Sequence, residues 1–381
     1  MKFSVLSVLS VLSFVQTGVL ADPTLSYLPV NTVYSFPYAS SVNINTPSSS
    51  IKTLFLAIHG IAGDVETTFN NMVSLTSYDS SIAVIAPYFA CDDSIPVQPK
   101  TLMFDCNGWQ QGTPSTQLSS IYSFTVVDRL LQTARSSFSN LGQIYIVGNS
   151  AGGQFVQRYL GSSTVALSSK LNTAVSFVIS APGSYLYLDN HRVASKMSFK
   201  AISSACQPSS CTLSNSDFDS NYGSSASCSS YNSDKYGLDG LQLQSPPTYM
   251  SQFSGPSIVS QYLSQKTTYM VGDQDVSTSS VLDSSCAAVA QGQNRLQRAL
   301  VFNRYIKLFF PQASSQLYVV SGCSHDEVCV FRSREFAAST NLNFLNLPST
   351  ANSWGAPSAL GQSLLSVLFC TVAALFWMAV V

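Results

Sequence analysis

The chain has 381 residues, and its 18 basic and 19 acidic side chains nearly cancel, which leaves a formal net charge of −1 at pH 7. Only 10% of the residues are charged, and no run of lysine or arginine occurs, which argues against nucleic acid as a partner. The length suffices for one large core or two small domains. Serine, threonine, asparagine and glutamine supply most of the polarity, a composition that suits an extracellular surface.

The amino terminus has the pattern of a secretory signal. Met1-Lys2 is a short basic start, residues 3–20 are mainly apolar, and Val19-Leu20-Ala21 has the small residues of a cleavage site. We therefore expect residues 1–21 to be a signal peptide and the mature chain to begin at Asp22.

The first part of the mature chain predicts strands on either side of one helix. Residues 22–50, polar with scattered aromatics and prolines, indicate irregular or edge-strand structure packed on the body. Buried strands are predicted at 52–58 and 82–86, with a helix at 66–75 between them. The first strand runs into His59-Gly60, where His59 is a candidate residue of a substrate pocket.

A long loop and a helix follow the second strand. The loop, residues 91–112, is expected at the edge of the sheet where ligands bind. It carries Trp109, which either lines the substrate pocket or anchors the loop. The helix is predicted at 116–138, with Asp128 and Arg129 as a solvated ion pair.

The stretch around Ser150 is the most informative part of the chain. Residues 143–147 are mostly β-branched or aromatic and lie between glycines, which predicts a buried parallel strand. Gly148-Asn149-Ser150-Ala151-Gly152 fits G-x-S-x-G, and residues 154–160 favour a helix. Strand, sharp turn and helix are the context that a nucleophile elbow requires. The alternative is an ordinary turn rich in glycine and serine.

The composition changes after a strand predicted at 174–180. Residues of about 184–260 are rich in serine, tyrosine and asparagine, include three cysteines and show weak periodicity, which predicts a disulfide-linked insertion. The insertion either caps a pocket and sets substrate choice or is a surface elaboration. Beyond it we expect alternating strands and helices, at 267–271, 287–310, 316–320 and 328–338.

Alternation of strands and helices along the whole chain predicts an α/β fold. The expected architecture is a mostly parallel central sheet with helices on both faces. No internal repeat and no clear linker is present, so residues 22–345 are predicted to form one domain that contains the single insertion.

A catalytic triad can be assembled from the chain order. A serine hydroxyl is a weak nucleophile at neutral pH, so Ser150 needs a base, and the base needs an acid that orients it. Chains with a nucleophile elbow place the acid and then the histidine after the serine. Of the three histidines, only His325 follows the strand at 267–271. Asp275 and Asp273 both qualify as the acid, and the spacing from the preceding glycine favours Asp275.

These motifs together resemble the α/β-hydrolase superfamily over about residues 50–340. They are most similar to secreted microbial esterases of the polyhydroxybutyrate depolymerase and feruloyl esterase type. The resemblance implies an ester hydrolase that acts through an acyl-enzyme on Ser150, with the backbone N–H groups of Ala151 and Ile61 as the oxyanion hole. Its substrate would be a small-molecule or polymer ester. Asn149 departs from the His or Tyr of many relatives, at a position that mostly affects packing. The motifs are His59-Gly60, Gly148-Asn149-Ser150-Ala151-Gly152-Gly153, Gly272-Asp273-Gln274-Asp275 and Gly322-Cys323-Ser324-His325-Asp326.

The cysteines predict disulfides and no metal site. Removal of Cys370 with the carboxyl-terminal tail leaves eight, which a secreted chain would oxidise to as many as four disulfides. Cys91–Cys106 and Cys323–Cys329 are the expected local pairs. No metal-binding spacing of cysteine or histidine occurs, so we expect neither a metal nor a cofactor.

The carboxyl terminus, residues 346–381, has the pattern of a GPI-attachment signal. Residues 364–381 are uncharged, apolar and run to the last residue, after a polar spacer and small residues at 349–355 that are candidates for the attachment site. A plain membrane span is the alternative. We therefore expect a secreted protein that is held at the cell surface or cell wall through a lipid anchor.

Two other functions stay open at this point. A peptidase or amidase could use the same triad, and a non-catalytic cell-surface protein could retain the fold for adhesion. The complete triad in the correct order argues against the second alternative. The oligomeric state is not indicated by the sequence.

Overall fold

A computed structural model describes residues 24–77, 79–92, 97–193, 197–225, 228–279 and 281–343. The predicted signal peptide, 1–21, and the predicted tail, 346–381, lie outside these described residues. Within the described ranges, no helix combines the length and the apolar character needed to span a bilayer.

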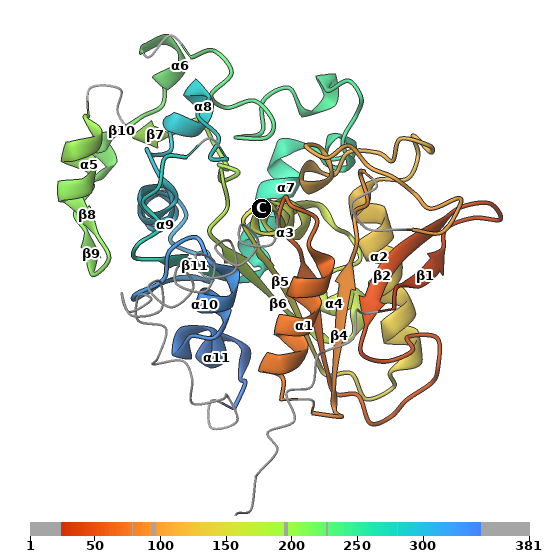
Figure 1. The fold of residues 1–381 in the computed structure, drawn as a ribbon. Coiled ribbons are helices and arrows are strands. Elements are labelled where there is room, and N and C mark those ends of the chain that lie inside the picture. The colour runs from red at the N-terminus through yellow and green to blue at the C-terminus, as the bar shows by residue number, and fades with distance from the viewer. Residues whose placement is uncertain are drawn as a thin grey trace, which may run out of the picture.

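A central sheet of eight strands confirms the predicted α/β architecture (Figure 1). Its order is β1-β2-β4-β3-β5-β6-β11-β12. The six strands from β4 to β12 are parallel, and β2 and β1 continue the sheet as antiparallel strands at one edge. The strands of this sheet are β1 Ser26–Pro29, β2 Ser35–Ser40, β3 Thr53–Ile58, β4 Ile82–Pro87, β5 Gln143–Asn149, β6 Ala174–Ser180, β11 Lys266–Gly272 and β12 Ser315–Val320.

Helices cover both faces of the sheet, because its central strands are apolar on both sides. In β5, Ile144 and Ile146 belong to one buried cluster, whereas Tyr145 and Val147 belong to the other. The helices on the first face are α2 Ser123–Ser137, α3 Ala151–Ser162, α7 Gly255–Ser264 and α9 Arg295–Phe309. Those on the second face are α1 Val65–Leu75, α10 Glu327–Phe331 and α11 Arg334–Thr340.

Two predicted helices are divided in the structure. The helix expected at 287–310 consists of α8 Cys286–Val289 and α9, and Gly292 between them has a φ of +140° that favours glycine. Asn294 caps α9, since its side chain accepts a hydrogen bond from the Gln297 N–H (2.9 Å). The helix expected at 328–338 is divided into α10 and α11.

The sequence suggested a solvated ion pair between Asp128 and Arg129, and the structure shows that this prediction was wrong. The Asp128 carboxylate is buried in α2 and accepts hydrogen bonds from the hydroxyls of Tyr159 (2.6 Å), Ser163 (2.6 Å) and Tyr249 (2.8 Å). Arg129 donates instead to the Val30 carbonyl. The Asp128 carboxylate therefore joins α2 to α3 and to the far end of the insertion. The three buried hydroxyls need a hydrogen-bond acceptor, and this carboxylate supplies it.

Buried arginines hold the segment predicted as an insertion, about 184–260. Arg158 of α3 joins it to the body by donating to the Lys235 carbonyl (2.5 Å). Arg192 links two parts of the segment itself, because it donates to the carbonyls of Tyr231 (3.1 Å) and Tyr236 (3.0 Å). Both guanidinium groups are fully buried, so the carbonyls replace the water that these cations lose. Short elements make up the segment and its surroundings: η1 Trp109–Gln111, α4 Ser168–Leu171, β7 Arg192–Val193, α5 Phe199–Ala205, β8 Cys206–Gln207, β9 Ser210–Cys211, η2 Asn215–Asp217, β10 Phe218–Asp219, α6 Tyr222–Ser225, η3 Leu241–Leu243 and η4 Tyr249–Gln252.

Four disulfides are present in the part of the chain that the structure describes, and they include both pairs expected from the sequence. Cys91–Cys106 closes the long loop, and Cys323–Cys329 closes the turn before α10. Cys206–Cys211 links β8 to β9. Cys228–Cys286 crosses from the insertion to α8 and so ties the insertion covalently to the chain beyond β11.

Candidate active site

Ser150 lies in a sharp turn between β5 and α3. Its φ of +58° is rare for a residue with a side chain, and its N–H donates to the Ser180 carbonyl (3.0 Å). A Cβ at Gly152 would lie 2.2 Å from the Ile58 carbonyl oxygen, and one at Gly148 would lie 2.4 Å from the Gly152 backbone. The glycines of G-x-S-x-G are therefore required by close backbone approach, which places the serine at the amino end of α3.

The structure brings together the three side chains expected to form the triad. His325 Nε2 is 3.0 Å from Ser150 Oγ, and His325 Nδ1 is 2.9 Å from Asp275 Oδ2. The Asp275 side chain is fully buried, whereas the His325 side chain is 26% exposed. Solvent can thus reach the hydroxyl and the imidazole while the carboxylate is shielded, as the proton transfers of a serine nucleophile require.

A glycine allows the loops of the acid and the base to meet. A Cβ at Gly272, at the end of β11, would lie 2.0 Å from the Cys323 carbonyl oxygen. The same carbonyl accepts a hydrogen bond from the Gln274 N–H (2.9 Å), so the two loops are joined through their backbones. The Cys323–Cys329 disulfide encloses His325 and further restricts the base loop.

The other two carboxylates near the triad have structural partners. Asp273 accepts hydrogen bonds from the Gly322 N–H (2.8 Å) and the Ser321 hydroxyl (3.2 Å). Asp326 caps α10, since its side chain accepts from the N–H groups of Val328 (2.9 Å) and Cys329 (3.2 Å). Neither carboxylate takes the place of Asp275 beside the imidazole.

The two backbone amides expected at the oxyanion hole are unengaged. Within the described part of the chain, the N–H groups of Ala151 and Ile61 donate to no acceptor. The Gly60 carbonyl accepts from His59 Nδ1 (2.7 Å) and from the Gly63 N–H (3.2 Å). The C=O and N–H of a trans peptide point in opposite directions. The bonds to the Gly60 carbonyl therefore direct the Ile61 N–H, in the same peptide, away from His59.

His59 does not line a substrate pocket, which corrects the expectation from the sequence. The ring is fully buried, and its Nε2 accepts a hydrogen bond from the Phe89 N–H (3.1 Å). Burial lowers the pKa of His59 to about 4, so the imidazole is neutral at physiological pH, with its proton on Nδ1. The buried imidazole orients the Gly60–Ile61 peptide through its hydrogen bond to the Gly60 carbonyl.

Trp109 is a loop anchor rather than a pocket residue. Its side chain is only 1% exposed and stacks on Phe89, with ring centroids 4.8 Å apart. The same indole lies 4.7 Å from the His59 ring, measured between centroids. Of the two roles that the sequence left open, the structure supports the anchor, because a side chain so fully buried cannot touch a ligand that enters from solvent.

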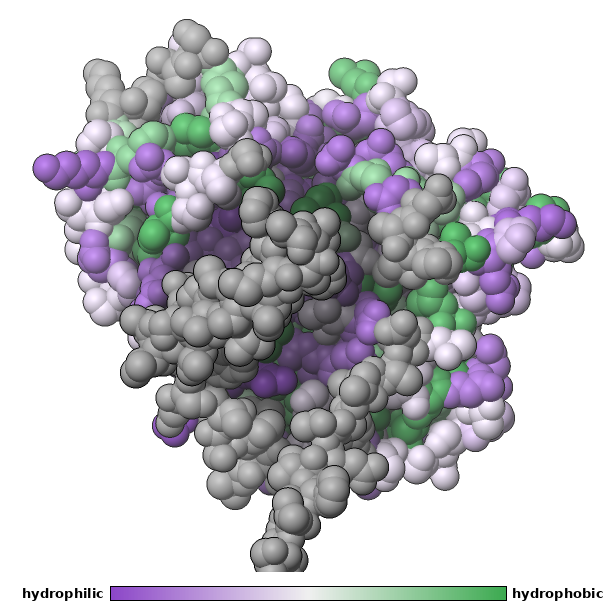
Figure 2. Space-filling model, viewed as in Figure 1, coloured by the Kyte–Doolittle hydropathy of each residue, from purple (hydrophilic) through white to green (hydrophobic). Residues whose placement is uncertain are grey.

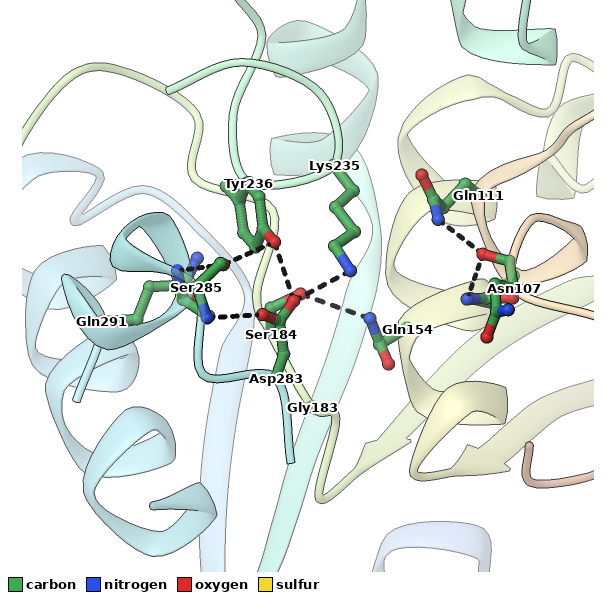
Figure 3. A network of polar contacts seen from close by, with 12 residues as sticks. Asn107, Gln111, Gln154, Gly183, Ser184, Lys235, Tyr236, Asp283, Ser285 and Gln291 are labelled. Carbon is green, nitrogen blue, oxygen red and sulfur yellow. Dashed lines mark hydrogen bonds and ion pairs between the residues drawn. The ribbon is translucent and has the colours of Figure 1, made fainter. Parts of the chain in front are cut away.

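A polar network beside the elbow was not foreseen from the sequence (Figure 3). Lys235 Nζ is 2.8 Å from Asp283 Oδ2, which also accepts from the Tyr236 hydroxyl (2.7 Å). Burial opposes ionisation of Asp283, but Lys235 and the hydroxyls of Tyr236 and Ser285 outweigh it and lower the pKa of that carboxyl. The network therefore joins the insertion to the segment between β11 and α8 by a charged contact as well as by a disulfide.

Amide side chains extend the polar surroundings of the serine. Gln154, one turn beyond Ser150 on α3, donates to the Ser184 hydroxyl (3.2 Å). Figure 3 shows Asn107 and Gln111 of the long loop on the opposite side of the view. Many hydrophilic residues are exposed on the face shown in Figure 2. Gln154 and Ser184 themselves are buried, so their hydrogen bond ties α3 to the start of the insertion.

One group of residues in the described ranges has metal-like spacing. Cys91, Asp92 and Cys106 offer sulfur and oxygen atoms that lie within 4.8 Å of one another. The two cysteines form a disulfide, so they supply no thiolate for a metal ion. The close spacing of these three residues is therefore explained by the disulfide, with Asp92 next to it in the sequence.

No protein-family model and no curated protein sequence matches this chain. Among solved structures, LpqC, a poly(3-hydroxybutyrate) depolymerase from Bordetella parapertussis, is similar with a TM-score of 0.52 and 19% identity, over 90% of this chain and 94% of that one. Poly(aspartic acid) hydrolase-1 from Sphingomonas sp. KT-1 gives a TM-score of 0.47 at 13% identity, over 80% and 94% of the two chains. An S-formylglutathione hydrolase from Agrobacterium tumefaciens gives 0.44 at 14% identity, over 84% and 94%.

These likenesses concern the fold. The LpqC comparison, together with the sheet order and the elbow, shows that this chain has the α/β-hydrolase fold. A fold of this kind hosts many activities, so the chemistry must be argued from the site itself.

Proposed function

We propose that this protein is a serine hydrolase that cleaves carboxylic esters through an acyl-enzyme on Ser150. The observation that carries the proposal is the continuous contact from Ser150 Oγ through the His325 imidazole to the Asp275 carboxylate, at 3.0 and 2.9 Å. A base within hydrogen-bond reach of a serine, itself oriented by a buried acid, is the arrangement that activates a hydroxyl for attack.

The reaction would proceed in two halves. His325 Nε2 takes the proton as Ser150 Oγ attacks the ester carbonyl, and the Asp275 carboxylate stabilises the imidazolium. The N–H groups of Ala151 and Ile61 would hold the oxyanion. The imidazolium then gives the proton to the leaving alcohol, and water activated by the same ring releases the acid from the serine.

An ester substrate is favoured over an amide by one comparison. The solved structure with a TM-score of 0.52 is named as a depolymerase of poly(3-hydroxybutyrate), a polymer joined by ester bonds. A peptidase or amidase on the same triad is the outcome that a matched substrate pair would reveal.

We also propose that residues 22–345 form the catalytic domain of a secreted protein with a lipid anchor at its carboxyl end. Four disulfides are compatible with an oxidising compartment. Release of the protein from intact cells by phosphatidylinositol-specific phospholipase C is the expected result. Retention in the membrane after that treatment, with extraction only by detergent, would favour a true span instead.

The proposed chemistry is tested by a fluorophosphonate probe on the purified, folded domain. We expect covalent labelling of the wild type and of Ser216→Ala, a matched change at an exposed serine, and none of Ser150→Ala. Hydrolysis of p-nitrophenyl acetate and butyrate should exceed that of the matching p-nitroanilides. Labelling that survives in Ser150→Ala would remove this serine as the nucleophile, and a preference for anilides would replace the esterase by an amidase.

A further inference from the structure

We infer that Arg295 is a positioning residue of the triad: its buried guanidinium faces the Asp275 carboxylate and keeps that carboxylate aimed at His325. The inference rests on the proposed function. Sequence reasoning placed Arg295 in the helix predicted at 287–310 and gave it no catalytic role, and nothing in the G-x-S-x-G pattern points to it.

The two oxygens of the Asp275 carboxylate have different neighbours. Oδ2 accepts the hydrogen bond from His325 Nδ1, whereas Oδ1 lies 3.9 Å from Arg295 Nη1. Within the described residues, Oδ1 has no hydrogen-bond donor. The separation is longer than a direct hydrogen bond, so the guanidinium acts on this oxygen through its charge.

Burial makes that charge effective. The side chains of Arg295 and Asp275 are 3% and 0% exposed, so neither ion is screened by bulk solvent. Burial lowers the pKa of Arg295 and the nearby Asp275 carboxylate raises it. Each ion thus compensates the other for lost hydration, and removal of either leaves the second unpaired.

The backbone fixes the guanidinium in place. Arg295 is the first residue of α9, directly after the capping Asn294. The next N–H, that of Leu296, donates to the Asp275 carbonyl (3.1 Å). The start of α9 is therefore joined to the acid loop itself, and Arg295 cannot move relative to Asp275 without breaking this contact.

Arg298 and Tyr185 are further ionisable groups close to the pair. Arg298 donates to the carbonyls of Gly292 (2.9 Å) and Asp283 (2.7 Å), and also to that of Gly183. Burial lowers the pKa of Arg298 to about 10, so it stays a cation at neutral pH. Burial raises the pKa of Tyr185 well above its usual value, so its phenol is neutral.

The charge of Arg295 should affect the pH dependence of kcat/KM, whereas a side chain that only packed against Asp275 should not. The field of the guanidinium opposes positive charge on the imidazole. Loss of the cation should therefore let the base take up a proton more readily, so the acidic limb of kcat/KM should move to higher pH by roughly one unit.

The test compares pH profiles of kcat/KM for an activated ester between pH 5 and 9. We expect Arg295→Met to shift the acidic limb upward by roughly one unit, with a loss of about tenfold on the acid side. Arg295→Lys, which keeps the charge, should restore the wild-type limb. Arg304→Met, an equal change further along α9, is the matched control and should leave the limb unmoved. A uniform loss with an unmoved limb in Arg295→Met would overturn the inference.

A second measurement covers the case in which Arg295→Met unfolds. If the defect is an unpaired buried carboxylate, Arg295→Met with Asp275→Asn should be more stable to urea than Arg295→Met alone. A double variant as unstable as the single one would show that Arg295 acts by packing, and would overturn the inference. Failure of the proposed function is distinguishable, because the wild type itself would then neither bind the fluorophosphonate nor hydrolyse the ester.

Discussion

At the scale of the residue, Asp273 and Asp275 show that position rather than chemistry decides the role of a carboxylate. Both follow β11, and the sequence left the choice between them open. Asp275 is 1% exposed and contacts the imidazole, whereas Asp273 holds the Gly322 N–H and the Ser321 hydroxyl at the surface. The side chain directions after a strand depend on loop conformation, which spacing alone does not determine.

Replacement of the two acids by their amides should separate these roles. Asp275→Asn keeps the shape but loses the charge that stabilises the imidazolium, so kcat should fall by roughly 10⁴-fold. Tm should fall as well, because the buried Arg295 guanidinium loses its anionic partner. Asp273→Asn should keep most of the activity and lose about 1 kcal/mol of stability. Steady-state kinetics and thermal unfolding of both variants provide the measurement. Equal losses of kcat would contradict the assignment.

Glu327 gives a pH dependence of stability. Its Oε2 accepts from the Thr68 hydroxyl (3.3 Å), and Oε1 is buried without a donor among the described residues. Burial raises the pKa of this carboxyl from 4.5 to about 7, and Asp64 and Asp326 add to the rise. Because the folded state holds the proton more tightly, this group's stabilising contribution is complete below pH 4.5 and is lost as the pH rises to about 7.

Glu327→Gln should remove that dependence. Relative to wild type, the variant's free energy of unfolding should increase between pH 4.5 and 7 and then level off. The total increase should be about 1.4 kcal/mol for each unit by which the folded-state pKa of Glu327 exceeds its unfolded-state pKa. Urea titrations at pH 4.5, 6 and 7.5 would show it. Parallel curves for the two proteins across this range would mean that Glu327 ionises normally.

At the scale of the element, the ends of β11 and β12 determine whether the triad can form. The two strands are paired in parallel, from Thr267 with Ser315 to Gly272 with Val320. Their following loops touch at Gly272 and Cys323, which is how the acid and the base come within reach of each other.

Gly272→Ala should therefore damage activity without touching a triad side chain. The added methyl would lie 2.0 Å from a backbone oxygen, so one loop must move, and displacements of about 1 Å can lower rates by about 10²-fold. Gly142→Ala, where the nearest atoms are 3.9 and 4.0 Å away, is the matched control and should keep full activity. Wild-type kcat/KM in Gly272→Ala would show that the contact is not needed.

The elements that were predictable from the sequence are those whose signal is local. The buried parallel strands appear as apolar runs, and β6 has the predicted bounds of 174–180. The break at Gly292 was missed because its strained φ arises from tertiary contacts, and the partners of Asp128 were missed because they lie 31, 35 and 121 residues away. For the same reason the sequence suggested the three triad residues but assigned no role to Arg295.

At the scale of the whole molecule, the insertion and the sheet form one connected structure. The buried Arg158, the Lys235–Asp283 ion pair and the Cys228–Cys286 disulfide all join residues of about 184–260 to the body. Since Asp283 and Cys286 lie beyond the triad acid, the insertion is attached to the segment that follows Asp275.

Removal of the Cys228–Cys286 disulfide should destabilise the protein more than removal of a local one. Sequence separations of 58 and 5 residues correspond to chain-entropy contributions of about 4 and about 2 kcal/mol. Cys228→Ala with Cys286→Ala should therefore lower the free energy of unfolding by more than Cys206→Ala with Cys211→Ala. Guanidinium titrations of both double variants provide the comparison, and a larger loss in the second would contradict the attachment described above.

The distance along the chain between the nucleophile and its base has a consequence for biosynthesis. The imidazole follows the serine by 175 residues, and it comes just after β12, which pairs only with β11 among the described strands. At the usual pace of translation, the elbow would be synthesised roughly 10–35 seconds before the histidine. Under the proposed function, the nascent protein would carry an unreactive serine until β12 has paired with β11, and capture by a fluorophosphonate would mark the moment at which folding is complete.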